Sequence, residues 1–98
     1  MGDLRFAWDS RKAAANHRKH GVSFGEAETV FADENALLLN DPEHSELEKR
    51  FVLLGLSSRL RILVVAHTLR QGGDTVRLIS ARKATRDERE QYFDRVMP

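Results

Sequence analysis

The spacing of hydrophobic residues changes along the chain, and this change predicts helices near both ends and strands in between. Short apolar runs between Ala36 and Ile79 are typical of strands bounded by turns. Apolar residues at intervals of three and four, as on one face of a helix, occur before and after this region. The predicted strands are Leu4–Trp8, Ala36–Asn40, Arg50–Leu56, Leu60–Leu69 and one that follows Asp74, and the predicted helices are Arg11–His20, one from Ser23 to Phe31 and one that begins after Thr85.

Residues that commonly cap helices mark the start of each predicted helix. Thr85 is followed three residues later by Glu88, and Ser23 by Glu26, so both pairs fit a reciprocal capping box. Asp9 is a suitable N-cap for the first helix. The last strand is therefore expected to run straight into a capped helix.

The first helix is expected to bury only a narrow side and to expose many basic residues. Its only apolar residues are Ala13–Ala15, so one narrow side can face a core. Gly21 follows its last turn, where a C-cap glycine is expected. Its polar residues are Arg11, Lys12, His17, Arg18, Lys19 and His20.

The second helix has an apolar stripe and an acidic remainder. Phe24, Ala27, Val30 and Phe31 recur at helical intervals, so this stripe should face the core. We interpret its acidic residues as the solvent-exposed face of this helix and the segment that follows its C-terminal end. They are Glu26, Glu28, Asp33 and Glu34.

The longest strand should lie at the centre of the sheet. Its run Ile62–Ala66 leaves no polar face, which indicates cover on both sides. Arg61 and His67 are six positions apart, an even number, so their side chains should point to the same face of the strand, near its opposite ends. Gln71–Asp74 has the glycines of a hairpin connection, whereas Asp41–Glu48 is a polar, acidic connection.

These elements predict an α+β fold. A short N-terminal strand and two helices precede a mainly antiparallel meander of about four strands, and a C-terminal helix follows. Tyr92 and Phe93 lie on the apolar stripe of this last helix and should dock on the sheet. A chain of 98 residues fits one domain with one modest core, so we expect a single domain over residues 1–98.

The formal net charge of +1 conceals strong segregation of charge. Residues 1–20 carry five Lys/Arg against two Asp, residues 21–48 carry eight carboxylates and no Lys or Arg, and residues 49–98 carry eleven Lys/Arg against five carboxylates. The two basic ends would form a positive face if they meet in the fold. Alternatively, the acidic and basic segments neutralise each other across the fold.

The amino-acid composition excludes several classes of function. The chain has no cysteine, which excludes disulfides, thiol nucleophiles and cysteine metal sites. The longest apolar run, Ile62–Ala66, is far too short to span a membrane, and residues Met1–Arg5 lack the long apolar segment that is typical of a signal peptide. We therefore expect a cytoplasmic protein that does not bind membranes.

Motifs for metal, nucleotide and serine chemistry are absent from the sequence. His17 and His20 are three residues apart on a helix, but the surrounding Lys and Arg would repel a metal cation. No HExxH, GxGxxG, GxxxxGK[ST] or GxSxG motif is present. We expect neither a metal nor a cofactor.

The remaining polar residues suit metal-free cleavage of RNA. In that reaction the substrate supplies the attacking 2′-hydroxyl, and the protein supplies cations and a group that moves protons. Arg61, Arg77 and Arg82 could hold phosphate, and His20, His67 or Tyr92 could act as acid or base. Each has a structural alternative: His20 could only cap a helix, His67 and Tyr92 could be buried, and Arg82 could pair with Glu88.

Strand alternation constrains how the two last arginines could act together. It places Arg77 with Ile79 and Ala81 on one face, and Ser80 with Val76 and Leu78 on the other. Arg77 and Arg82 would then point to opposite faces of the strand. They can converge on one phosphate only if Arg82 lies past the strand end, in the turn before Thr85, with Lys19 and His20 nearby.

The sequence also resembles a known family, the BrnT toxins, which are the ribonuclease halves of type II toxin–antitoxin pairs. The resemblance runs from about Phe6 to Tyr92, and the KHGVSF block at Lys19–Phe24 with the block Arg77–Ala84 is specific in this order and spacing. The further matching residues are Phe6–Asp9, Lys12, Ala13, Asn16, Asp41, His44, Ser45, Glu48–Arg50, Glu88, Arg89 and Tyr92.

The resemblance implies a fold similar to RelE-type ribonucleases and cleavage of RNA, in particular messenger RNA. It also implies a BrnA-like antitoxin with a ribbon-helix-helix domain, through which alone the pair would bind operator DNA. The candidate catalytic residues are His20, Arg77, Arg82, His67 and Tyr92, and the candidate RNA-binding residues are Lys12, Lys19, Arg61, Ser80 and Lys83.

Two other functions fit the same residues. The chain could be a non-catalytic module whose basic surface docks an acidic protein or a nucleic acid. It could also be a degenerate toxin that binds its antitoxin and no longer cleaves RNA.

Overall fold

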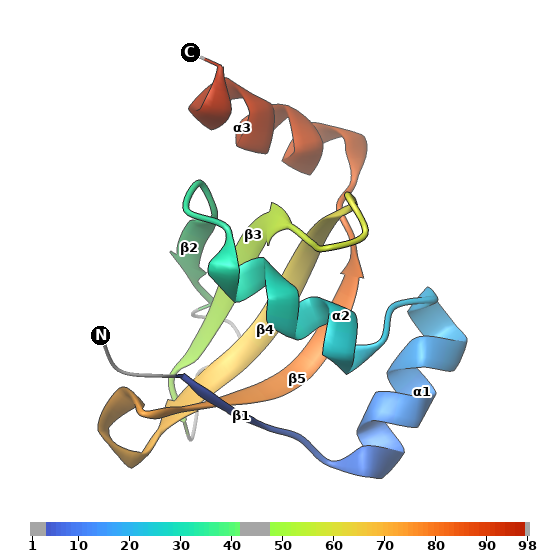
Figure 1. The fold of residues 1–98 in the computed structure, drawn as a ribbon, viewed down its shortest axis with the longest axis vertical. Coiled ribbons are helices and arrows are strands. Elements are labelled where there is room, and N and C mark those ends of the chain that lie inside the picture. The colour runs from blue at the N-terminus through green and yellow to red at the C-terminus, as the bar shows by residue number, and fades with distance from the viewer. Residues whose placement is uncertain (1–3, 42–47, 98) are drawn as a thin grey trace.

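The computed structural model describes residues 4–41 and 48–97, which form a five-stranded sheet with helices around it (Figure 1). The strand order is β1-β5-β4-β3-β2, antiparallel except that β1 runs parallel to β5. The elements are β1 (Arg5–Ala7), α1 (Ser10–His20), α2 (Phe24–Thr29), the 3₁₀ helix η1 (Val30–Ala32), β2 (Leu37–Asn40), β3 (Arg50–Leu56), β4 (Ile62–Arg70), the 3₁₀ turn η3 (Gln71–Gly73), β5 (Thr75–Lys83) and α3 (Arg86–Val96). The predicted α+β class and mainly antiparallel meander are confirmed. Most of the acidic connection predicted at Asp41–Glu48 lies outside the described residues.

The predicted helix caps are confirmed, with one difference. Asp9 Oδ1 accepts the backbone N–H groups of Arg11 and Lys12 at 2.8 and 3.3 Å. Gly21 adopts the left-handed conformation of a C-cap, with φ 68°. Thr85 and Glu88 exchange both hydrogen bonds of a capping box.

The difference concerns the N-terminus of α2. Ser23 Oγ accepts the backbone N–H of Glu26 at 3.0 Å, as expected of an N-cap. The carboxylate of Glu26 does not return the bond, because it accepts hydrogen bonds from Arg61 and Ser57. The prediction that Glu26 lies on a solvated face is therefore wrong: its residue is only 6% exposed.

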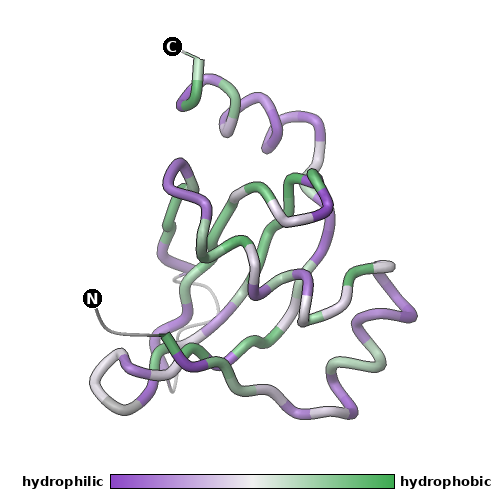
Figure 2. The backbone as a smooth tube through the Cα atoms, in the orientation of Figure 1, coloured by the Kyte–Doolittle hydropathy of each residue, from purple (hydrophilic) through white to green (hydrophobic). Residues whose placement is uncertain are grey.

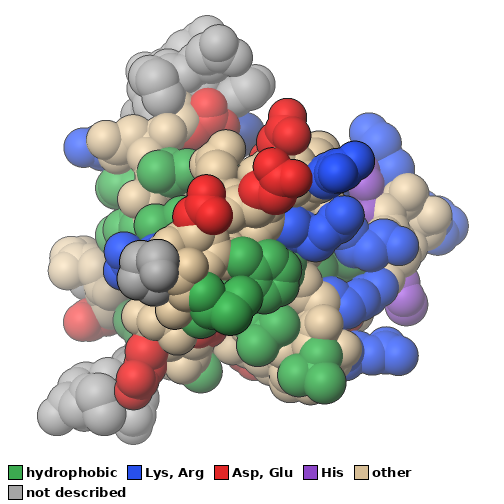
Figure 3. Space-filling model, turned by 90° about the horizontal axis from the view of Figure 1, so that it is seen from above, with side chains coloured by type: hydrophobic (Ala, Val, Ile, Leu, Met, Phe, Trp, Pro, Cys, Tyr) green, Lys and Arg blue, Asp and Glu red, His purple; other side chains and the backbone are tan. Residues whose placement is uncertain are grey.

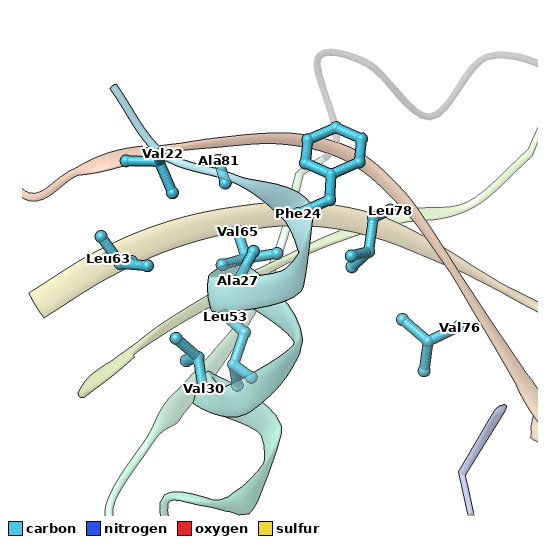
Figure 4. Packing of buried hydrophobic residues seen from close by; sticks show 10 residues of the cluster. All are labelled: Val22, Phe24, Ala27, Val30, Leu53, Leu63, Val65, Val76, Leu78 and Ala81. Atoms are coloured by element: carbon cyan, nitrogen blue, oxygen red, sulfur yellow. The ribbon is translucent and has the colours of Figure 1, made fainter. Parts of the chain in front are cut away.

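The sheet buries side chains on both faces, but unequally. In Figure 1, α2 and η1 cross one face, and there they cover a core cluster that includes Leu63, Val65 and Phe24 (Figure 4). On the other face, α3 covers one end of the sheet through Tyr92, which packs near Val64. Figure 2 shows the hydrophobic residues along the central strands and α2, whereas α1 and α3 are largely hydrophilic.

The central position of β4 is confirmed, since it pairs with β3 on one side and β5 on the other. Its even-numbered residues Ile62 and Val64 belong to the cluster under α3, and Leu63 and Val65 belong to the cluster under α2. Tyr92 docks on the sheet as predicted. Phe93 does not, because its residue is 43% exposed.

A β-bulge in β5 changes which of its residues share a face. Ala66 is opposite Ser80, and the next residue, His67, is opposite Leu78, so Ile79 has no partner of its own in β4. Before the bulge, Val76 and Leu78 are buried toward α2.

After the bulge, Ala81 is buried toward α2 as well. The alternation predicted for β5 is therefore wrong. Arg77 and Ser80 lie on one face, because the extra residue shifts the parity between them. The strand also continues to Lys83, so Arg82 is not past its end.

Candidate nucleic-acid interface

The bulge brings three of the predicted site residues onto the same face of β5. Arg77 stands opposite Thr68, Ser80 opposite Ala66, and Arg82 opposite Val64. Cross-strand partners point to the same side of a sheet, and the even-numbered residues of β4 face away from α2. Arg77, Ser80 and Arg82 therefore form a row on the sheet face opposite α2.

The spacing along this row matters for its chemistry. Five residues of extended chain span roughly 15 Å between the Cα atoms of Arg77 and Arg82. Two arginines at that separation suit neighbouring phosphates along one strand of nucleic acid better than one shared phosphate.

Asn16 fixes the first helix against this part of β5. Its side-chain amide donates to the carbonyl oxygens of Ala81 at 2.8 Å and Val22 at 2.9 Å, and its carbonyl accepts the N–H of Ala81 at 3.0 Å. β1 pairs only with Thr75–Arg77, so the amide of Asn16 takes the place of a neighbouring strand further along β5. Sequence reasoning found Asn16 only through the family resemblance.

The orientation of Asn16 determines where the lysines of α1 project. Residues in an α-helix are about 100° apart around the axis, so Ala13 and His20 lie on one side of Asn16 and Lys12 and Lys19 on the other. Ala13 packs against the core under α2. Lys12 and Lys19 therefore lie toward the opposite sheet face, beside the β5 row.

We call Lys12, Lys19, Arg77, Ser80 and Arg82 together the β5–α1 face. Figure 3 shows that Lys and Arg side chains gather on the side of the molecule where α1 lies, together with histidines. The basic ends of the sequence thus meet in space, which is the first of the two arrangements that the charge pattern left open.

Of the two arginines of this face, Arg77 is the one whose side chain has no partner among the described residues. Its side chain makes no hydrogen bond or ion pair with any of the residues that the structure describes, and the residue is only half-buried. Hydrogen bonds from the backbone N–H groups of Lys12 and Arg11 keep the pKa of Asp9 below its usual value, and the positive charge of Arg77 adds a smaller effect in the same direction. Beside it in the sheet, the buried hydroxyl of Thr68 has no hydrogen-bond partner among the described residues.

Arg82 is already paired, as the structural alternative anticipated. Its Nη1 and Nη2 donate to the two carboxylate oxygens of Glu88 at 2.7 and 2.9 Å. These bonds raise the pKa of Arg82 and lower the pKa of Glu88 to about 2. A guanidinium has five N–H donors, so Arg82 held in this way keeps donors for a phosphate.

A second group of candidates lies around the C-terminal end of α1. Arg61 donates to the buried carboxylate of Glu26 through Nε at 2.9 Å and to the carbonyl of Gly21 through Nη2 at 3.0 Å. His20 precedes Gly21, and Lys83 projects from β5 opposite Leu63, toward the α2 side. The structure thus separates His20, Arg61 and Lys83 from the β5–α1 face.

Two candidates for proton transfer lie inside the protein. His67 is 2% exposed, with its ring near Phe31 and Phe51, and burial lowers its pKa so that it stays neutral. Tyr92 is 4% exposed and donates to Asp33 Oδ2 at 2.7 Å, and burial with this bond raises its pKa to about 12. Of the three candidates, His20 alone is partly open to solvent.

The described residues show two further absences. Among residues 4–41 and 48–97, no three His, Asp or Glu side chains are grouped so that they could hold a metal ion. Within the same ranges, every helix is too short or too polar to cross a membrane.

The fold and its cationic face define a class: small α+β proteins with an arginine- and lysine-rich sheet face, a charge pattern that is typical of nucleic-acid-binding surfaces. The comparisons give the family. Residues 8–88 match the model of the family described as "Ribonuclease toxin, BrnT, of type II toxin-antitoxin system", and the chain belongs to this family. The resemblance inferred from the sequence is confirmed.

A solved structure supports the same fold. The crystal structure of the Brucella abortus ribonuclease toxin, BrnT, matches with a TM-score of 0.65 and 23% sequence identity, covering 86% of this chain and 100% of that chain. At this identity the match shows the fold and not the site. Among curated proteins, no match is found.

Proposed function

We propose that the chain is a metal-independent endoribonuclease that cleaves messenger RNA in the cytoplasm and is neutralised by a ribbon-helix-helix antitoxin. The observation that carries this proposal is the β5–α1 face, where Arg77 lies without a partner among the described residues. The pair would reach operator DNA only through the antitoxin. Membership of a ribonuclease toxin family supports this activity.

The proposed reaction uses a nucleophile of the substrate. The 2′-hydroxyl of one nucleotide attacks the adjacent phosphorus and gives up its proton, and the 5′-oxygen of the next nucleotide leaves with a proton. The products are a 2′,3′-cyclic phosphate and a 5′-hydroxyl. A DNA strand lacks the nucleophile, so the mechanism itself selects RNA.

Each polar residue of the site has a role in this proposal. Arg77 stabilises the negative charge that builds on the phosphorus-bound oxygens of the reacting phosphate, and Arg82 binds a neighbouring phosphate. Lys12, Lys19 and Ser80 bind the flanking phosphates. The burial of His67 and Tyr92 assigns those two to the interior. His20 is the proposed proton-transfer group, because it is the partly exposed candidate, although it lies on the other side of α1 from Lys19.

Arg77→Ala tests the proposal. Purified protein in EDTA should cleave single-stranded RNA to products with 2′,3′-cyclic phosphate ends and should leave DNA intact. Arg77→Ala should lower the cleavage rate by about 100-fold, as expected for loss of one charge-stabilising donor. Its melting temperature should stay near wild type, because no described hydrogen bond is lost.

Arg18→Ala is the matched control, because Arg18 is an exposed residue on the opposite side of α1 from Asn16. It should cleave like wild type. Cleavage that stops in EDTA, or products with 3′-hydroxyl ends, would contradict the mechanism. RNA binding without any cleavage would identify a binding module, which the burial of two proton-transfer candidates favours as the second function.

A further inference from the structure

The turn between β3 and β4 carries a leucine in a backbone conformation that favours glycine. The carbonyl of Ser57 accepts the N–H of Leu60 at 2.9 Å, and the N–H of Ser57 donates to Arg61 at 2.8 Å. This pattern is a three-residue hairpin loop, in which the last loop residue takes the left-handed conformation and is usually glycine. Leu60 has φ 63° and is the one residue other than glycine with positive φ among the described residues.

Leu60 contributes little to folding. Its residue is 80% exposed, the largest exposure of any large hydrophobic residue in the described chain. A strained backbone and an exposed apolar side chain both count against leucine here, and such strain tends to be retained at functional sites. The side chain is therefore better explained by a contact with another molecule.

Leu60 forms one wall of a surface groove of about 290 Å³. The groove lies between the β3–β4 turn, the end of β5 and the helix α3. Phe93 of α3 is also part of its lining and is 43% exposed, while Leu56 and Ile62 line its inner part. Exposed apolar side chains that gather around a hollow are typical of binding sites.

The charged residues of this groove are all cations. Arg61, Lys83 and Arg89 line it, and no carboxylate does. Arg61 is held by Glu26, and Arg89 donates through Nη1 to the carbonyl of Ala84 at 3.2 Å. Lys83 makes no ion pair with any described residue.

We propose that this groove is the docking site of the antitoxin. Its occupant is an amphipathic segment whose apolar side covers Leu60 and Phe93 and whose carboxylates meet Lys83 and Arg89. This inference rests on the proposed function, because it takes the antitoxin as the partner. The cationic rim complements an acidic segment. The most exposed apolar residue of the lining, Leu60, is aliphatic and has no flat face on which an RNA base could stack, and Phe93 is the single aromatic residue of the lining.

The position of the groove explains how docking there would inhibit the enzyme. Lys83 of the groove and Arg82 of the β5–α1 face are consecutive residues of β5. Consecutive strand residues point to opposite sides of a sheet, so a protein segment seated in the groove lies at the end of the sheet that carries Arg82, beside the RNA-binding face and not on it. The antitoxin would hinder RNA binding by occupying space beside it, without contacting Arg77.

Leu60→Asn provides the test. The probe is the purified ribbon-helix-helix protein encoded beside this chain, and its affinity is measured by calorimetry. Leu60→Asn should raise the Kd at least tenfold, and Arg89→Glu should also weaken binding. Since asparagine tolerates the left-handed conformation, Leu60→Asn should melt at or above the wild-type temperature and cleave RNA at the wild-type rate without antitoxin.

Leu69→Asn is the control, since Leu69 lies near the other end of β4 and is 42% exposed. It should bind the antitoxin like wild type.

Wild-type affinity in Leu60→Asn would overturn the docking site and leave the ribonuclease intact. Weaker RNA binding in Leu60→Asn, or conversion of a dimer into a monomer, would assign the groove to RNA or to a second copy and would also overturn it. Failure of the wild-type chain to cleave RNA would instead contradict the proposed function.

Discussion

At the residue scale, the same side-chain type takes different roles because of partners distant in sequence. Glu26 and Glu34 are both acidic residues near α2, and both fit a solvated face. Glu26 is instead buried, because Arg61 and Ser57, some thirty residues later, surround its carboxylate. Hydrophobic periodicity contains no information about such a partner.

Glu26→Gln should therefore destabilise the protein. The amide keeps the volume but loses the charge that balances Arg61, and removal of one member of a partly buried charged network costs about 1–3 kcal/mol. Urea unfolding at neutral pH measures the loss. Glu34→Gln, at an exposed position, should change the free energy of unfolding by less than about 0.5 kcal/mol. Equal losses in the two variants would show that the Glu26 network adds nothing.

Glu88 should make the free energy of unfolding depend measurably on pH in the acid range. Its pKa is lowered from 4.5 to about 2 in the folded state, chiefly by hydrogen bonds from Arg82. Stability from this pair is fully present above the unfolded pKa and is lost as the pH falls from 4.5 toward 2. Both side chains are partly exposed to solvent, so we expect about 1 kcal/mol.

Glu88→Gln isolates this contribution from that of other carboxylates. Chemical unfolding is measured for both proteins from pH 7 to pH 2. The variant should be less stable at pH 7, and the difference from wild type should shrink as the pH falls through the same window. A difference that stays constant with pH would contradict the assignment.

At the element scale, local features of the sequence predicted most of the structure. The N-cap at Asp9, the capping box at Thr85 and the strand Arg50–Leu56 depend on neighbouring residues, and all three are confirmed. The bulge at Ile79 depends on the register between β5 and β4, which no local pattern encodes. Alternation therefore gave the wrong face for half of β5, and with it the wrong geometry for Arg77 and Arg82.

Asn16 should be essential for the position of α1. Its amide satisfies both the N–H and the carbonyl of Ala81, so Asn16→Ala leaves two backbone groups of β5 without these bonds and should cost about 2–3 kcal/mol. Thermal unfolding followed by circular dichroism measures this. Ala14→Ser, at an exposed position of the same helix, should lie close to wild type. A small effect of Asn16→Ala would indicate that packing alone positions α1.

At the scale of the whole molecule, a net charge of +1 coexists with a concentrated basic face. The segregation of charge is plain in the sequence, but the sequence left open whether the two basic ends meet and which cations would point the same way. Of ten predicted site residues, five share the β5–α1 face, because α1 is fastened along β5 by Asn16. Of the rest, Arg61 and Lys83 line the groove, His67 and Tyr92 are buried, and His20 ends α1 on the side away from this face. The predictions used residue type and not the direction of each side chain.

The charge arrangement predicts a specific dependence of RNA binding on salt. Each phosphate neutralised on a single strand contributes about −0.7 to the slope of log K against log salt concentration. Lys12→Ala removes one cation from the β5–α1 face and should reduce the magnitude of the slope by about 0.7. Arg86→Ala changes the net charge equally but lies on exposed α3, with Glu90 3.6 Å away, so its slope should stay at the wild-type value. Fluorescence anisotropy with a short single-stranded RNA between 50 and 200 mM salt, roughly the range over which such contacts are screened, measures both. Equal changes in the two variants would mean that RNA responds to total charge, and the cationic face would then have no special role in binding.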